Sequence, residues 1–219
     1  MRSSAACWAS AALAAGALAG AAGATTPELD EILRRMASAS GVEAPFEERK
    51  ELALLVEPLE TRGVIYFVPP DRFARFTTSP GASALIVAGE AVQLREGPEA
   101  RPVDLSGNRV ARAFVENFVA LWSGDREKLE SLYRPELHGT RDAWELRLVP
   151  RRAPLSEAIE AITLRGDRES MRELLVVERD GDRTTTRFGA TRTDRVFTPE
   201  ELRQIFGAGL PLEGARAER

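Results

Sequence analysis

The chain is 219 residues long, 43% of them hydrophobic and 29% charged, and its formal net charge is −4. That length is enough to bury a full hydrophobic core as one domain. The acidic balance and the lack of a run of lysines and arginines argue against nucleic acid as a partner, because phosphate neutralisation needs clustered cations.

The N-terminus has the pattern of a cleavable signal peptide. Arg2 is followed by an alanine-rich apolar run, and Ala22-Gly23-Ala24 fits an A-x-A cleavage site. A retained membrane anchor is the alternative, but alanine and glycine contribute little transfer free energy. We therefore expect residues 1–24 to be removed on export. The only cysteine, Cys7, lies in this segment without the leucine-led motif of a lipidated cysteine, so the exported chain has no disulfide.

A short amphipathic helix is predicted next. Thr25 or Thr26 can cap it, Pro27 suits its first turn, and Glu28 completes a capping box with Thr25. The apolar positions follow the i, i+3, i+4, i+7 rule and form one stripe, made of Leu29, Ile32, Leu33 and Met36. Ser38 to Gly41 ends the helix.

From Val42 the period changes to two, which indicates half-buried strands. The predicted strands are 45–56, 61–68, 72–77, 84–88 and 91–95. The turns between them are supplied by Pro69-Pro70-Asp71, Ser79-Pro80-Gly81 and Gly89-Glu90. Such short links predict an antiparallel meander.

The second half of the chain returns to helical spacing before a second set of strands. A longer helix is predicted over 108–122, with a wide, aromatic apolar face that includes Phe114 and Phe118. A helical turn near 126–132 and strands at 143–149, 158–164, 171–178 and 183–191 follow, with a hairpin turn at Asp180-Gly181-Asp182. Thr198 caps a terminal helix that runs through Phe206. Residues 25–207 are thus expected to form one domain, followed by a flexible tail at 208–219.

The sequence gives little support for catalysis. His138 is the only histidine, no G-x-S-x-G elbow occurs, and neither glycine-rich nucleotide-binding loop is present. A zinc site lacks its cluster of His and Cys. The acidic pairs Glu47-Glu48, Asp180/Asp182 and Glu200-Glu201 fall in turns, caps or charged strand faces. We expect no enzyme activity, no cofactor and no metal; a lipid or glycan hydrolase would rest on these scattered groups alone.

Several predicted strands are apolar at consecutive positions, so both faces of the sheet must meet something other than water. The clearest is Gly63–Val68, and the same character recurs in Leu52–Val56, Leu85–Val87 and Leu174–Val177. One face can pack against a helix while the other lines an apolar cavity. A sheet buried between helices, or a sandwich core, fits the same periodicity.

These stretches resemble a known family, the periplasmic outer-membrane lipoprotein carrier proteins (LolA). The order and spacing of the following segments carry the resemblance: Pro45–Lys50, Gly63–Phe73, Ser79-Pro80, Leu85–Gly89, Leu148–Pro150, Ile162–Leu164 and Met171–Phe188. What the resemblance implies is a mainly β fold with helices (α+β), an incomplete, strongly curved antiparallel β-barrel closed by a helical lid around an apolar cavity.

The resemblance also implies a function. A periplasmic carrier, acting as a monomer, would shield the acyl chains of a lipoprotein or a related lipid and move them from the inner to the outer membrane. Its contacts with an inner-membrane ATP-driven exporter and an outer-membrane acceptor would be transient. The alternative on the same scaffold is a periplasmic lipid- or lipoprotein-sensing regulatory module.

The candidate cavity or lid residues are Ile65, Phe67, Phe73, Leu85, Val87, Phe114, Phe118 and Leu174. Phe73 corresponds to the family's phenylalanine at the mouth of the barrel. The chain departs from the family pattern at Pro69, where the family has the basic residue that latches the lid, because proline has no donor. It departs again at Ala88, in place of an aspartate, and at Gln93 or Leu94, in place of an aromatic residue.

Overall fold

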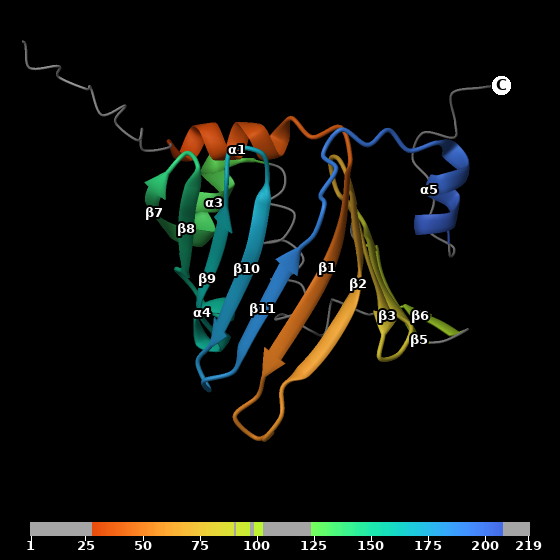
Figure 1. Cartoon of the computed structure of the whole chain (residues 1–219), viewed down its shortest axis with the longest axis horizontal. Helices are drawn as coiled ribbons and strands as arrows, with labels where there is room; N and C mark the ends of the chain where they lie inside the picture. Colours follow the sequence, from red (N-terminus) through yellow and green to blue (C-terminus); the bar gives the residue numbers. More distant parts are fainter. Residues whose placement is uncertain (1–27, 90, 97–98, 103–123, 208–219) are drawn as a thin grey trace, which may run out of the picture.

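The computed structural model describes residues 28–89, 91–96, 99–102 and 124–207. Eleven strands in the described residues form one sheet in the order β6-β5-β4-β3-β2-β1-β11-β10-β9-β8-β7 (Figure 1). The strands are β1 Val42–Glu51, β2 Leu59–Val68, β3 Arg72–Ser79, β4 Ser83–Ala88, β5 Ala91–Glu96, β6 Glu99–Pro102, β7 Tyr133–Thr140, β8 Ala143–Pro150, β9 Ile159–Gly166, β10 Met171–Glu178 and β11 Arg183–Phe188. The helices are α1 Leu29–Ala37, α3 Arg126–Leu132, α4 Leu155–Ala158 and α5 Pro199–Phe206.

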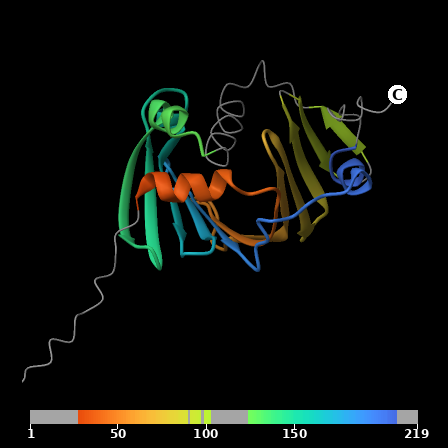
Figure 2. The same cartoon turned by 90° about the horizontal axis from the view of Figure 1, so that it is seen from above.

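Two antiparallel meanders make the sheet, and they meet in its middle. β1 to β5 follow one another along the chain as predicted, β6 adds a further strand at the edge, and β7 to β11 form the second meander. The two are joined where β11 pairs with β1, with Phe188 opposite Phe46. The sheet curves into a deep trough that does not close, because its edge strands β6 and β7 lie on opposite walls (Figure 2). The predicted α+β fold with an incomplete, curved antiparallel barrel is confirmed.

Each face of the sheet packs against a different helix. α1 crosses one end of the trough on the concave side, while α5 lies against the outside of the wall formed by β2 to β4 (Figure 2). In α1 the predicted stripe buries Ile32 and Leu33. In α5 the side chain of Phe206 is fully buried among residues of the outer face such as Ala74 and Ile86.

α5 begins with a complete capping box. The Thr198 hydroxyl accepts from the Glu201 backbone amide at 3.2 Å, and the Glu201 carboxylate accepts from the Thr198 amide at 2.8 Å. This is the predicted start of the terminal helix. The predicted cap of α1 is wrong, since that helix has Glu28 as its N-cap residue, with no capping hydrogen bond from its side chain.

Two predicted strands end earlier than expected, and the strands β6 and β7 were not predicted. β1 ends at Glu51, so the apolar run 52–56 belongs to the β1–β2 loop; β11 ends at Phe188 instead of continuing to 191. β7 was not predicted because it contains Pro135 and Gly139, two residue types that are rare inside strands. Its place at the sheet edge tolerates them, because the outer side of an edge strand needs no ladder hydrogen bonds.

Other predictions fall outside the described residues. These are the signal peptide 1–24, the long helix 108–122 with its candidate residues Phe114 and Phe118, and the tail 208–219. None of the helices within the described residues combines the length and the apolar composition that crossing a bilayer requires.

Candidate functional site: the concave face of the sheet

The predicted cavity residues of the first meander come together on the concave face. Antiparallel pairing places opposite residues on the same side of a sheet, and the pairs Phe67 with Phe73 and Phe73 with Val87 put these three in one row. Ile65 and Leu85 belong to the next row. All five lie in or against one apolar cluster, and of these five only Leu85 is half-buried.

Leu174 lies on the opposite wall of the same face. It pairs with Leu164, which in turn pairs with Leu146 of β8. On its other side Leu174 pairs with Thr186, and Thr186 pairs with Glu48 of β1. The concave surface is therefore continuous from one wall to the other, although Leu174 packs in a different cluster from Phe73.

A hollow opens beneath α1, where the two apolar clusters meet. Its volume is about 50 Å³, and its apolar lining consists of Ile32, Met36, Ala39, Ala44, Trp144, Met171 and Phe188. The polar part of the lining is Arg35, Asp167, Glu169, Ser170, Thr191 and Thr193. None of the predicted cavity residues that the structure describes lines it. In this state it has room for only a few water molecules.

A second hollow, of about 380 Å³, is larger but chemically different. Its lining comes from β1, β2 and β11 and consists of charged and hydroxyl-bearing side chains, among them Glu47, Arg62 and Arg187. Glu47 pairs with both of these arginines across the sheet, on the face opposite Phe46. A charged wall of this kind does not suit an acyl chain, so the smaller hollow under α1 fits apolar ligands better.

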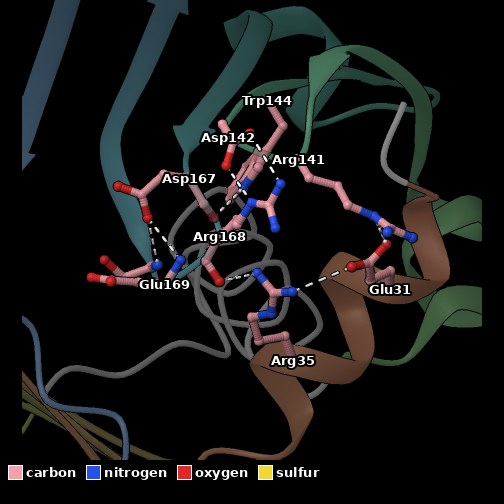
Figure 3. A network of polar contacts seen from close by, with 9 residues as sticks. Glu31, Arg35, Arg141, Asp142, Trp144, Asp167, Arg168 and Glu169 are labelled. Atoms are coloured by element: carbon pink, nitrogen blue, oxygen red, sulfur yellow. Dashed lines mark hydrogen bonds and ion pairs between the residues drawn. The ribbon is translucent and has the colours of Figure 1, made fainter. Parts of the chain in front are cut away.

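Polar contacts hold α1 at the end of the trough (Figure 3). Arg141, in the β7–β8 turn, lies with its Nε 2.9 Å from a carboxylate oxygen of Glu31, and Arg35 donates to the backbone carbonyl of Arg168 in the β9–β10 turn. Arg168 also pairs with Asp142, and its hydrogen bond lowers the pKa of that carboxyl. The helix is thus tied to two turns and makes no use of Pro69, the position at which the family has its latching residue.

A polar group interrupts the apolar concave face at β1 to β3. Arg75 lies between Ile65 and Leu85 in its row, and its guanidinium carbon is 4.5 Å from the ring centroid of Phe46. It pairs with Glu48, which also accepts a hydrogen bond of 2.9 Å from Thr186. The concave face therefore has an apolar part towards α1 and a charged part farther along β1.

Three carboxylates come close together at the β10–β11 turn. Oxygens of Glu178, Asp180 and Asp182 lie within 4.8 Å of one another. Each has a partner in the protein: Glu178 pairs with Lys50 at 3.5 Å, Asp180 accepts from the Asp182 amide at 3.1 Å, and Asp182 accepts from the Ala53 amide at 2.8 Å. We therefore assign this group a structural role in the turn.

The sequence profile of the LolA-like outer membrane lipoprotein carrier proteins matches residues 19–206. The chain belongs to this family. A search of curated proteins finds no match.

Several solved structures are similar to this chain at low sequence identity. A LolA superfamily protein from Nitrosomonas europaea is 10% identical, with a TM-score of 0.45, and the match covers 80% of this chain and 97% of that one. A putative outer membrane lipoprotein-sorting protein domain from Vibrio parahaemolyticus is 9% identical, with a TM-score of 0.46 and coverage of 80% and 95%. MucB in the MucA/MucB complex of Pseudomonas aeruginosa is 18% identical, with a TM-score of 0.47; the match covers 80% of this chain and 60% of that one.

Sequence reasoning missed part of the site of this LolA-like chain. Arg75 follows Phe73 by two residues, so strand periodicity already placed both on one face, but a charged residue is ordinarily assigned to solvent. The approach of Thr191 and Thr193 to α1 was also missed, because the segment after Phe188 was predicted to continue as a strand. Only the fold brings that segment to the hollow.

Proposed function

We propose that this LolA-like protein is a periplasmic carrier that shields the acyl chains of a lipoprotein or a related lipid against its concave face. Cargo would pass from an inner-membrane ATP-driven exporter to an outer-membrane acceptor through brief contacts with each. Membership of the family and the two apolar clusters on the concave face support this proposal. The protein needs no catalytic group for the task, because binding capacity comes from apolar area.

The free energy of shielding is large. Each methylene removed from water contributes about 0.8 kcal/mol, so an acyl anchor exposed in the periplasm is strongly disfavoured. The hollow of about 50 Å³ under α1 is too small for a whole acyl chain. Loading therefore requires α1 to shift from the apolar clusters against which Ile32, Leu33 and Met36 pack. The residues we propose for contact with the chains are Ile65, Phe67, Phe73, Leu85, Val87 and Leu174, together with Phe114 and Phe118 outside the described residues.

The decisive experiment is mass spectrometry of lipids extracted from the purified protein, with two cavity variants and one control. Phe73→Glu places a charge in the buried row, and Met36→Glu places one at the half-buried wall of the hollow, where the fold is less at risk. Val196→Glu is the control, because Val196 is exposed on the segment before α5. Thermal unfolding checks that each variant folds.

The expected result is acyl lipid in the wild type and in Val196→Glu, and loss of lipid in both cavity variants. A folded wild type that carries no lipid and refuses an added fluorescent fatty acid would sink the proposal. A wild type without lipid that instead holds a stable membrane-tethered protein would indicate the regulatory module.

A further inference from the structure

The β1–β2 loop presents a group of exposed aliphatic side chains. The exposed fraction of the residue is 96% for Leu54 and 47% for Leu55, and Val56 is fully exposed; Leu59, the first residue of β2, is 49% exposed. Single exposed apolar residues are ordinary, but three consecutive ones in a loop, with a fourth at the start of the next strand, indicate an interaction surface. We call these four residues the apolar tip.

The apolar tip is ordered by hydrogen bonds within the chain. The Leu55 amide donates to the Leu52 carbonyl at 3.0 Å, which closes a turn, and the Ala53 amide donates to Asp182 of the neighbouring β10–β11 turn at 2.8 Å. The loop therefore holds its apolar side chains outward without being disordered. Binding through the tip costs little ordering entropy, since the backbone is already fixed.

The position of the tip leaves it free to meet a flat surface. The β1–β2 loop projects beyond the sheet at the end opposite α1 (Figure 1). The side chains of Leu54 and Val56 point away from the body and do not line either hollow of the described residues. A folded protein would need a matching groove to receive such a convex projection. The acyl region of a bilayer adapts its shape, and it takes up apolar side chains without a preformed pocket.

Charges around the tip limit how it can bind. Acidic residues surround the tip: Glu51 ends β1, Glu57 lies in the β1–β2 loop, and Asp180 and Asp182 lie in the β10–β11 turn. The basic residues Arg49 and Lys50 lie in β1. This mixture offers no cationic patch to attract anionic headgroups. Binding would therefore depend on burial of the aliphatic side chains, and the carboxylates would keep insertion shallow.

We propose that the apolar tip inserts into the interfacial layer of a lipid bilayer and thereby docks the protein on a membrane surface. The docked orientation places α1 and the hollow on the side away from the bilayer. This contact is separate from ligand binding on the concave face, so it stands or falls independently of the carrier role.

Vesicle flotation tests the proposal. The chain from residue 25, which contains every described contact, is mixed with phosphatidylcholine vesicles, and the vesicle-bound fraction is measured at low and high salt. We expect the wild type to float with the vesicles at both salt concentrations. Replacing Leu54→Ser and Val56→Ser together should weaken partitioning about tenfold or more, because two exposed aliphatic side chains lose their burial in lipid.

The matched control is Val196→Ser. Val196 is 75% exposed but lies on the segment between β11 and α5, away from the tip, so its loss should leave partitioning unchanged. All three positions are exposed, and the variants are expected to unfold at the same urea concentration as the wild type.

The proposal is overturned if the wild type stays in the buffer, if the double variant floats as well as the wild type, or if Val196→Ser loses binding equally. It is also overturned if binding requires phosphatidylglycerol and disappears at high salt, since that would be electrostatic attraction. Acyl lipid that copurifies with the protein is measured on the same protein preparations. A wild type that floats but carries no lipid removes the carrier role alone, and a lipid-loaded wild type that never floats removes the membrane contact alone.

Discussion

Arg75 and Glu48 form an ion pair inside the concave face, with Nη2 of Arg75 2.8 Å from Oε1 of Glu48. The pair is largely withdrawn from water, since the exposed fraction is 28% for the Arg75 side chain and 14% for that of Glu48. Two charges placed together in such a setting contribute little net stability, because desolvation offsets their attraction. Removing one of them is different, because it leaves the other charge uncompensated.

We therefore expect Arg75→Met to lower the free energy of unfolding by about 2–3 kcal/mol, below the range for a fully buried pair because both groups retain some exposure. The double variant Arg75→Met with Glu48→Gln should recover most of that loss, since Thr186 can donate to a neutral amide as well as to a carboxylate. Urea unfolding of the wild type, both single variants and the double variant measures the coupling. Additive effects would contradict the pairing described here.

Gly63 provides a test of how tightly β1, β2 and β3 pack. A Cβ added at this position would lie 1.8 Å from the carbonyl oxygen of Phe76 and 2.8 Å from Cε1 of Phe46. The first neighbour is backbone and cannot move aside without disturbing the β2–β3 pairing. We expect Gly63→Ala to cost about 2 kcal/mol or more, as overpacked positions do.

Gly81 is the matched control for this substitution. An added Cβ there meets nothing within 4 Å, so Gly81→Ala should change the free energy of unfolding by about 0.5 kcal/mol or less, or stabilise slightly by restricting the unfolded chain. Urea unfolding of both variants checks the contrast. Equal effects at the two positions would show that Gly63 is not packed as described.

Much of the strand pattern could be predicted from the sequence, because two-residue periodicity and turn residues are local signals. Met171–Glu178 was predicted with its observed bounds, and the capped start of α5 at Thr198 was recognised from four residues. The consecutive apolar positions of Gly63–Val68 predicted a strand apolar on both faces, and the two faces of β2 pack in different clusters. Each of these depends on neighbours along the chain.

The rest depends on contacts that the sequence does not display. The run Leu52–Val56 has the composition of a buried strand, and only the end of β1 at Glu51 and the hydrogen bond from Ala53 to Asp182 make it an exposed loop. Ala53 and its hydrogen-bond partner Asp182 are 129 residues apart in the chain. The sequence predicted that the outer face of β2 is apolar, but it did not predict which helix covers that face. The curvature of the sheet and the path of the chain after β11 place α5 there.

The ion pairs of Glu43 in β1 with Arg192 and Arg195, on the segment before α5, should make the stability of the fold depend on pH. Burial raises the pKa of Glu43, but hydrogen bonds from Arg195 and Arg192 outweigh it, so the pKa lies below its ordinary value. A carboxyl with a lowered pKa stabilises the fold fully at pH values above its ordinary pKa of about 4.3. That contribution is lost as the pH falls from there through the lowered pKa of the folded state. The pKa of Glu201 is lowered too, through hydrogen bonds from the Thr198 amide and Arg195.

We expect the free energy of unfolding of the wild type to fall between about pH 5 and pH 3 more steeply than that of Glu43→Gln, which has no carboxyl to protonate at this site. Urea unfolding at a series of pH values measures both curves. Parallel curves would mean that the contacts of Glu43 with Arg192 and Arg195 do not stabilise the folded protein.

Apolar packing and ion pairs both attach α1 to the sheet, and we expect the apolar packing to contribute more to the free energy of unfolding. Leu33 is buried in the cluster beneath the helix, and truncating such a side chain leaves a cavity, so Leu33→Ala should cost about 3 kcal/mol. Glu31 pairs with Arg35 and Arg141 near the surface, and Glu31→Gln should cost at most about 1 kcal/mol. Urea unfolding compares the two, while hydrogen exchange of the α1 amides reports local opening. Equal losses would mean that the ion pairs, and not the apolar stripe, hold the helix over the hollow.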